Sequence, residues 1–408
     1  MDKRLLTPVR LLALLTMAAW SVALLWPQGL GLIGISDYGM RFLDAYSILA
    51  AVDAVRAGFD PHVPIAFDPL GRPLAYSDWW LALKWTGLTR AQGLAFGAAW
   101  VAAFGATAWA TAKPRTWREA LWLAAVLASP PVLLAVIRAN NDLVIFVLLA
   151  GCGALLAGQH KHRWLVAVAG IGLATGLKYY PAAAILMLLW LRPVRQVPAV
   201  LGAGLLVAVL SLVSVLPDLK RAPLGAPGGV HTMGAPILWH DLGWTDAQAL
   251  IPAVLLFVVA GALFAWTGVT AGLASRGLPR ERVLAALSVS LLLACFISGV
   301  NYAYRWIFVV WVALWLWRRA HEDLPSRQRY AAGLACLLVF LCLWLDGVLC
   351  LVVNQLPPKS PAWIEQLQVV YRAWTQPLHW LLMALLAGWL LEAVIAIGRE
   401  WRQQRVAA

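Results

Sequence analysis

The sequence predicts an all-α membrane protein that crosses the bilayer many times. Of its 408 residues, 62% are hydrophobic and only 12% are charged, and the mean hydropathy is +0.76. Apolar runs of about 20 residues, the length that crosses a hydrocarbon core, recur along the whole chain. The connections between these runs are strongly basic on one predicted side. Such a composition excludes a single water-soluble globule.

The apolar runs predict about twelve transmembrane helices in a single membrane domain, residues 1–408. We place them at approximately residues 10–33, 91–112, 117–137, 141–158, 163–177, 179–192, 196–217, 247–274, 282–300, 302–317, 329–353 and 375–397. The first run is too long for the apolar region of a signal peptide, so we expect a retained helix. Ser129, Pro130 and Pro131 predict a distortion within the third run.

Basic residues distinguish the two predicted sides. The connections predicted to lie inside are residues 1–10, 113–118, 159–163, 192–196, 275–282, 318–329 and 399–405. Basic and acidic residues cancel on the opposite side, so the whole net charge of +13 falls on the inside. A nucleic-acid partner is therefore not required, and membrane lipids are the expected surroundings. We expect a bacterial inner-membrane protein whose segments 34–90, 218–246 and 354–374 face the periplasm or the exterior.

The first outer segment, residues 34–90, contains a predicted amphipathic helix at residues 44–57. Its apolar positions are Ile48, Leu49, Val52 and Val55. Gly58 is typical of a helix end, and Pro61 prevents the helix from continuing. The helix is too short and too polar to span a bilayer. We therefore expect it to lie along the membrane surface, with its apolar stripe in the lipid boundary.

Polar residues end three of the apolar runs on the outer side. They are Arg138, Asn140, Asn141 and Asp142; Lys178 and Tyr179; and Tyr302, Tyr304 and Arg305. The positive-inside rule does not account for the three cations, which together could hold a lipid phosphate or pyrophosphate. The alternative for each cation is a side chain that extends to the lipid headgroups. A further acid, Asp346, is expected to be buried in the outer half of its helix.

Three segments resemble the motifs of glycosyltransferase family 87. Residues 44–62, DAYSILAAVDAVRAGFDPH, match the pattern D-x5-A-A-x6-G-x-D-P, with His62 where the family often has Tyr. RANND at 138–142 and GLKYYP at 176–181 are similar to the family's Asn-containing and G-x-K-x-x-P segments. Arg138 and Ala139 stand where the family often has Gly-Gln.

The resemblance implies a polytopic enzyme of the GT-C fold, similar to mannosyltransferases. Such enzymes take a hexose or pentose from a polyprenyl-phosphate sugar donor and pass it to a lipid or glycan acceptor. The reaction needs a carboxylate to accept the acceptor's proton and cations to stabilise the departing phosphate. One base acting opposite the leaving group predicts inversion at the sugar.

Asp44 is the candidate base, because a carboxylate at an interface beside apolar residues can have a raised pKa. Asp37, at the end of the first run, is the rival base. For either residue the structural alternative is an N-cap. Nucleotide-sugar motifs are absent, which favours a lipid-linked donor.

The second outer segment, residues 218–246, is rich in Gly and Pro and is predicted to be a loop, a candidate lid. Its His231, His240 and Asp241 place polar groups on the outer face, and we include His240 among the substrate-binding candidates. The two histidines lack metal-ligand spacing, and the five cysteines lack metal or disulfide spacing. No metal or cofactor is predicted.

Two other classes share some of these features. A secondary transporter would also have many spans, but it would place ionisable residues near the bilayer midplane and show two similar halves. A flippase or ligase for lipid-linked glycans would share the outer cations without needing Asp44.

Overall fold

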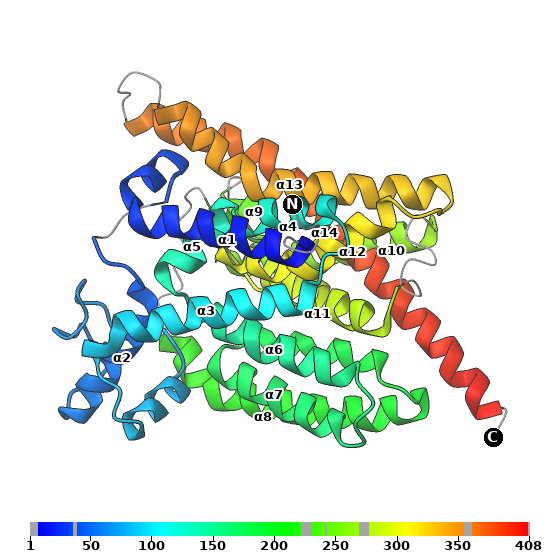
Figure 1. The fold of residues 1–408 in the computed structure, drawn as a ribbon, viewed down its shortest axis with the longest axis horizontal. Helices are drawn as coiled ribbons and strands as arrows, with labels where there is room; N and C mark the ends of the chain where they lie inside the picture. The colour runs from blue at the N-terminus through cyan, green and yellow to red at the C-terminus, as the bar shows by residue number, and fades with distance from the viewer. Residues whose placement is uncertain are drawn as a thin grey trace.

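The chain is a bundle of helices, many of which run roughly side by side (Figure 1). This computed structural model describes residues 7–35, 39–221, 231–240, 243–268, 277–354 and 361–406. The α-helices are α1 (Pro8–Leu25), α2 (Leu43–Arg56), α3 (Gly93–Ala112), α4 (Trp117–Leu127), α5 (Pro130–Arg138), α6 (Asp142–Leu156), α7 (Arg163–Leu177), α8 (Val197–Arg221), α9 (Ile237–His240), α10 (Asp246–Trp266), α11 (Pro279–Ile297), α12 (Val310–Ala320), α13 (Ser326–Asn354) and α14 (Pro361–Val406).

Short 3₁₀ segments and one small sheet complete the described part of the chain. The 3₁₀ segments are η1 (Pro27–Ile33), η2 (Asp78–Trp85), η3 (Arg90–Gln92), η4 (Tyr180–Trp190), η5 (Val194–Gln196) and η7 (Ala303–Val309). The sheet pairs two strands of two residues each, β1 (Thr232–Met233) and β2 (Asn301–Tyr302). Helix thus dominates the described residues, as the all-α class predicts.

Local sequence signals account for several helix boundaries. Thr116 caps α4 by accepting a hydrogen bond from the backbone N–H of Glu119 at 3.2 Å. The predicted distortion after Ser129 is a break, because α4 and α5 meet at an angle of 61°. Pro130 and Pro131 cause it, since proline cannot donate the hydrogen bonds that would continue α4.

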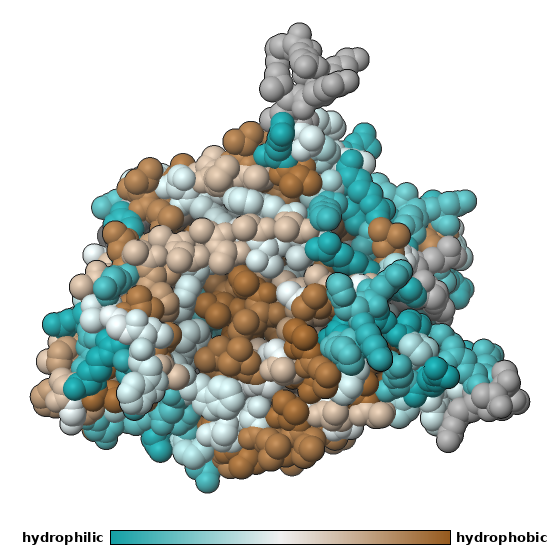
Figure 2. All heavy atoms as spheres, turned by 60° about the horizontal axis from the view of Figure 1, so that its bottom comes forward, coloured by the Kyte–Doolittle hydropathy of each residue, from teal (hydrophilic) through white to brown (hydrophobic). Residues whose placement is uncertain are grey.

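Six helices in the described part of the chain are long and apolar enough to cross a membrane, or seven if the bent α4–α5 pair is one span. These six are α1, α3, α8, α10, α13 and α14. The other apolar runs form α6, α7, α11, η4 and the η7–α12 pair. On the face shown in Figure 2, apolar residues gather across the middle and hydrophilic residues toward the margins. These features indicate a membrane-embedded protein, and the count of twelve spans stays a prediction.

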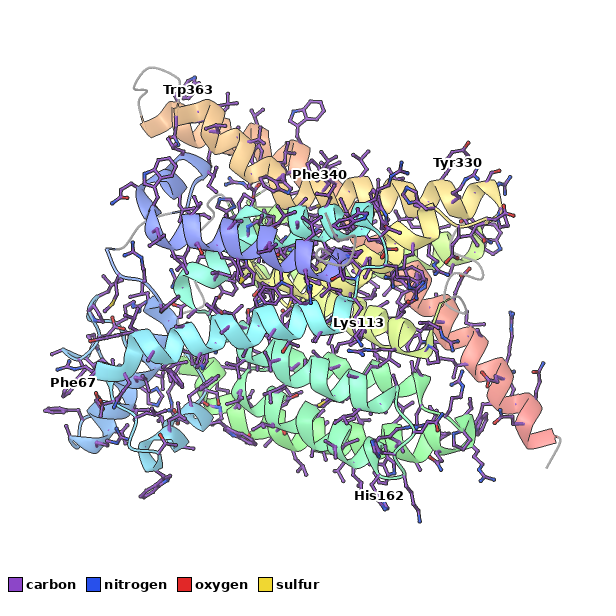
Figure 3. All side chains as sticks on the ribbon, viewed as in Figure 1. Phe67, Lys113, His162, Tyr330, Phe340 and Trp363 are labelled. Atoms are coloured by element: carbon purple, nitrogen blue, oxygen red, sulfur yellow. The ribbon has the colours of Figure 1, made fainter. Side chains whose placement is uncertain are left out.

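Most of the residues labelled in Figure 3 lie toward one end of the bundle or the other. Phe67 and Trp363, from segments predicted outside, lie at one end. Lys113, His162 and Tyr330, from or beside connections predicted inside, lie toward the other. We name these the outer end and the inner end after that prediction.

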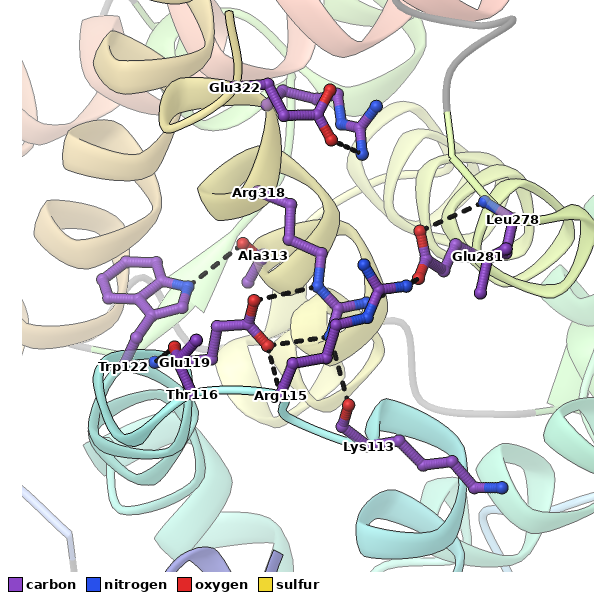
Figure 4. Close-up of polar contacts among 11 residues, drawn as sticks. Lys113, Arg115, Thr116, Glu119, Trp122, Leu278, Glu281, Ala313, Arg318 and Glu322 are labelled. Atoms are coloured by element: carbon purple, nitrogen blue, oxygen red, sulfur yellow. Dashed lines mark hydrogen bonds and ion pairs between the residues drawn. The ribbon is translucent and has the colours of Figure 1, made fainter. Parts of the chain in front are cut away.

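Buried ion pairs connect helices at the inner end (Figure 4). Arg318 of α12 donates to both carboxylate oxygens of Glu119 in α4, at 3.1 and 2.8 Å, and to Glu281 of α11 at 2.7 Å. Arg115, in the connection before α4, also pairs with Glu281. These pairs satisfy buried charges and join three helices at one point.

The predicted amphipathic helix exists as α2, but its surroundings differ from the prediction. Ile48, Leu49 and Val52 are completely buried within the protein. The helix packs against α3 and η2, which supply the apolar partner surface. Its stripe therefore does not face the lipid boundary. Arg56 at its end donates to the carbonyl oxygen of Lys84 at 2.8 Å and so ties the helix to η2.

The second outer segment is partly built into the fold. Helix α8 continues to Arg221, beyond its predicted end at residue 217, and residues 222–230 lie outside the described part of the chain. Thr232 then pairs with Tyr302, and Met233 with Asn301, in the antiparallel β1–β2 sheet. Residues 231–235 and 299–303 together are called the clamp below.

Asp346 anchors the clamp. As predicted, it is buried in α13. Its carboxylate accepts a hydrogen bond from the backbone N–H of His231 at 3.0 Å and another from the hydroxyl of Tyr371 in α14. The carbonyl oxygen of His231 in turn accepts a hydrogen bond from the N–H of Ala303 at 2.7 Å. A buried carboxylate thus fixes the backbone that leads into η7.

Candidate active site

Four segments distant in sequence meet at the outer end. They are the start of α2, the turn between α5 and α6, the joint between α7 and η4, and the β2–η7 segment. The α5–α6 turn shows how the sequence shapes the site. Ala139 has a φ of 41°, a left-handed conformation that ends α5. Asn140 then accepts a hydrogen bond from the backbone N–H of Asp142 at 3.0 Å, at the start of α6.

Asp44 lies in a buried cage of donors. Its side chain is 1% exposed. Arg138 approaches both carboxylate oxygens, with Nε 2.9 Å from Oδ2 and Nη2 2.6 Å from Oδ1. Asn140 donates to Oδ2 at 2.7 Å. Because Phe42 occupies the N-cap position of α2, Asp44 is not an N-cap, and the structural alternative is wrong for this residue.

The cage determines the charge of Asp44. Burial alone would raise the pKa of its carboxyl group, as the interface prediction assumed. The positive charge of Arg138 and the hydrogen bonds from Arg138 and Asn140 outweigh burial, and the pKa lies below its ordinary value of 3.8. Asp44 is therefore ionised at neutral pH. The predicted raised pKa is wrong because the sequence did not reveal the bidentate arginine.

A second carboxylate, Asp142, lies on the other side of Asn140. It is completely buried and forms an ion pair with Lys178. The hydroxyl of Tyr180 donates to the same Oδ1 atom at 2.6 Å. Lys178 also donates to Asn141 at 2.7 Å and reaches Asn140 at 3.4 Å. The two carboxylates thus belong to one hydrogen-bonded network.

Arg305 is the third cation of this network. Its guanidinium donates to Asn301 and lies 3.4 Å from the hydroxyl of Tyr179. It also lies over the ring of Tyr180, 4.8 Å from the centroid. Arg305 is 6% exposed, and within the described residues it forms no ion pair with a carboxylate. Its buried Nε has no hydrogen-bond partner there.

Aromatic rings border the cations. The ammonium of Lys178 lies 5.4 Å from the ring of Tyr304 and 5.9 Å from that of Tyr76. Tyr302 stacks on Tyr304 with 5.5 Å between centroids, and is 39% exposed. The network therefore has an aromatic boundary that reaches the protein surface at Tyr302.

The structure brings together most of the residues predicted for the site. Direct contacts connect Asp44, Arg138, Asn140, Asn141, Asp142, Lys178, Tyr179, Tyr302, Tyr304 and Arg305. The rival base Asp37 and the side chain of His240 lie outside the described residues.

The cations do not extend to the lipid headgroups. The side chains of Arg138 and Lys178 are 19% and 10% exposed, and each forms an ion pair with a carboxylate. In this structure both cations are paired within the protein, and their contact with a donor phosphate stays a prediction. Only the buried Arg305 keeps a charge that no carboxylate in the described chain balances.

Some members of the site did not emerge from the sequence. Tyr76 and Arg72 come from the first outer segment, where no motif distinguishes them. Arg72 pairs with Asp68 at 3.0 Å and is near enough for its charge to act on Asp44. Tyr180 and Asn301 were visible only as neighbours of the predicted residues. The sequence signal for Tyr180 and Asn301 was that they lie within a few residues of Lys178 and Arg305.

Comparison with protein-family models, curated proteins and solved structures finds no match. The likeness to glycosyltransferase family 87 therefore rests on the motifs alone. Within the described residues, no group of three or more His, Cys, Asp or Glu side chains could hold a metal ion. The described site offers carboxylates and cations as its charged groups.

Proposed function

We propose that the protein is a glycosyltransferase that moves a hexose or pentose from a polyprenyl-phosphate donor to a lipid or glycan acceptor. The observation that supports this most strongly is the buried pairing of Asp44 with Arg138 inside a network that also contains Lys178 and Arg305. It combines a carboxylate that can accept a proton with cations that can stabilise a phosphate leaving group.

The charge of the network matches such a donor. Three cations, Arg138, Lys178 and Arg305, face two carboxylates, Asp44 and Asp142, which leaves one net positive charge. A polyprenyl-phosphate sugar is a phosphodiester with one negative charge. Binding its phosphate near Arg305 neutralises the excess charge, and a partly dehydrated site strengthens that interaction.

Donor binding also supplies a way to activate Asp44. In the structure, Arg138 engages both oxygens of Asp44 and weakens it as a base. A phosphate near Arg138 competes for the guanidinium. Release of Asp44 then raises its pKa, because burial dominates once the arginine has moved. The base thus gains strength when the donor is present.

The reaction follows as a single displacement. Asp44 takes the proton of the acceptor hydroxyl, whose oxygen bonds to the anomeric carbon. The bond from that carbon to the phosphate oxygen breaks, and its electron pair stays on the polyprenyl phosphate. Arg305 and Lys178 stabilise the additional negative charge. Because the acceptor attacks opposite the leaving group, the configuration inverts.

Transfer of labelled sugar by the reconstituted protein tests this function. The donors are polyprenyl phosphates carrying mannose, arabinose or glucose, and the acceptors are extracted envelope lipids and glycans. Asp44→Asn keeps the shape and removes the basicity, so we expect turnover to fall about 10²-fold or more. The thermal midpoint should fall, because Arg138 loses the buried carboxylate with which it pairs, so turnover is measured at a temperature at which the variant is folded.

Asp53→Asn is the matched control, because Asp53 lies on the same helix but pairs with Arg56. It should keep full activity. Transfer that survives Asp44→Asn would remove Asp44 from the reaction. Failure of every donor, together with movement of the labelled lipid across the bilayer, would favour the transporter or flippase class.

A further inference from the structure

A small basic pocket lies at the inner end of the bundle. Its volume is about 200 Å³, roughly that of six or seven water molecules. It is lined by Leu156, Ala157, Gly158, Gln159, Arg163, Trp190, Arg192, Pro279, Arg282 and Val283. These residues come from three connections that the sequence predicts inside and from the helix ends beside them. Helix α11 separates this pocket from the candidate active site by its 19 residues, about 28 Å.

The lining carries three arginines and no carboxylate. Arg163 donates to the carbonyl oxygens of Gly158 and Arg192, the latter at 2.6 Å, so carbonyls and not carboxylates occupy it. Arg192 pairs with Glu400 of α14 at 3.0 Å. The side chain of Arg282 has no hydrogen bond or ion pair in the described part of the chain, and its Nε is buried without a partner. The pocket therefore keeps an excess of positive charge.

Helix ends of both signs meet at the pocket. Helix α7 begins at Arg163 and α11 at Pro279, which brings two positive N-terminal ends there, whereas α6 ends at Leu156 and brings a negative C-terminal end. Glu281 already complements the first turn of α11. The excess of arginine side chains and the unpartnered Nε of Arg282 therefore indicate an anionic ligand.

A larger hollow nearby does not share this property. Its volume is about 600 Å³, and Arg115, Arg118 and Arg318 are among its lining residues. Glu119 and Glu322 line it as well, and Glu119 and Glu281 occupy two of these arginines, as Figure 4 shows. Its charges are largely balanced within the protein. The carboxylate-free pocket is the better anion site.

We propose that the pocket of Arg163, Arg192 and Arg282 binds a phosphate group. Arg282 supplies the free donors, and Arg192 forms the opening, since 40% of its side chain is exposed. Trp190 is an apolar wall beside the cations and stacks on Trp389 of α14. The phosphate belongs either to an anionic phospholipid whose headgroup lies at this end of the helices or to a phosphate ion from solution.

The experiment measures binding to the purified full-length protein in detergent. Phosphatidylglycerol, phosphatidylcholine and inorganic phosphate are titrated separately, and the thermal unfolding midpoint reports occupancy. Arg282→Gln should weaken binding of the phosphate ligand about tenfold or more, the effect of losing a charge-assisted hydrogen bond. Arg282→Lys keeps the charge and should restore part of the affinity. Arg118→Gln is the control, because Arg118 is exposed at the same end and does not line this pocket.

Each result has a defined meaning. A response to phosphatidylglycerol that depends on Arg282 and is absent with inorganic phosphate identifies a lipid site. A response to inorganic phosphate with the same dependence identifies a site for a soluble anion. Equal binding by wild type, Arg282→Gln and Arg118→Gln, or no binding of either phosphate probe by wild type, overturns the proposal. Arg192→Gln replaces Arg282→Gln if the latter does not fold.

Discussion

Arg138 controls the protonation of Asp44. The lowered pKa of Asp44 depends on this arginine, because burial acts in the opposite direction. A carboxyl group whose pKa is lower in the folded state stabilises the fold above its unfolded pKa. That contribution is lost as the pH falls through the folded value. The pair therefore stabilises the outer end at neutral pH, and acid removes that effect.

Arg138→Gln should move the acid limb of the activity profile to higher pH. The substitution removes the charge and the bidentate hydrogen bonds, so burial raises the pKa of Asp44 above 3.8. The measurement is the pH dependence of kcat/KM for sugar transfer, with Arg138→Lys as the charge-preserving control. An acid limb identical to that of wild type would show that Asp44 is not the titrating base.

Arg305 has a different expected effect. It is the cation that no carboxylate in the described chain occupies, so its loss should affect the donor directly. Arg305→Gln should weaken binding of a polyprenyl-phosphate sugar roughly ten- to hundredfold. The acid limb should stay in place, because Asp44 keeps Arg138. Unchanged donor affinity, measured by titration, would remove Arg305 from the phosphate site.

At the level of single residues, the sequence indicated which side chains are present but not how they pair. Asp44 and Arg138 are 94 positions apart, and no local pattern joins them. The motifs marked both as site residues, whereas their bidentate contact depends on how α2 packs against α5. The same packing explains why the predicted raised pKa of Asp44 was wrong.

Among the elements, α2 and the clamp show what periodicity can and cannot predict. The helix was expected at 44–57 and lies at Leu43–Arg56, because the apolar period and Gly58 determine its ends. Its burial was not predictable, since an apolar stripe fits lipid and protein equally well. The clamp was missed because two strands of two residues have no period to detect.

The clamp positions Arg305 from a distance. Asp346 accepts a hydrogen bond from the backbone of His231, which directly precedes strand β1. Strand β1 pairs with β2, and Asn301 of β2 accepts a hydrogen bond from Arg305. Gly234 permits the close approach, because a side chain there would collide with the backbone of Gly299. The chain of contacts runs from the buried carboxylate of α13 to the proposed phosphate site.

Asp346→Asn should loosen the clamp. The substitution replaces a charged acceptor with a neutral amide, so the hydrogen bonds from His231 and Tyr371 weaken. We expect a loss of about 1–3 kcal/mol in the free energy of unfolding and weaker donor binding. Asp323→Asn, an exposed acid at the inner end, is the control. A variant as stable as wild type, with unchanged donor affinity, would separate the clamp from the site.

At the scale of the whole molecule, the candidate active site and the basic pocket lie at opposite ends of α11. Asn301 lies just beyond the end of α11 and Arg282 near its start, and the 19 residues of α11 span about the thickness of a hydrocarbon core. The phosphate chemistry proposed at each end would then concern opposite leaflets. Only the orientation in the membrane decides which leaflet is which.

Cysteine labelling in intact cells tests this orientation and the membrane setting together. The five native cysteines are buried and should react little. Val63→Cys and Tyr330→Cys place new thiols at sites that are 50% and 70% exposed, at the outer and inner ends. Because basic connections face the cytoplasm, an impermeant maleimide added outside should label residue 63 and spare residue 330 until the membrane is opened. Leu255→Cys, on α10, is 61% exposed in the protein but should resist the reagent from both sides, because lipid covers it. Labelling of residue 330 from outside would reverse the topology, and ready labelling of residue 255 would place α10 in water.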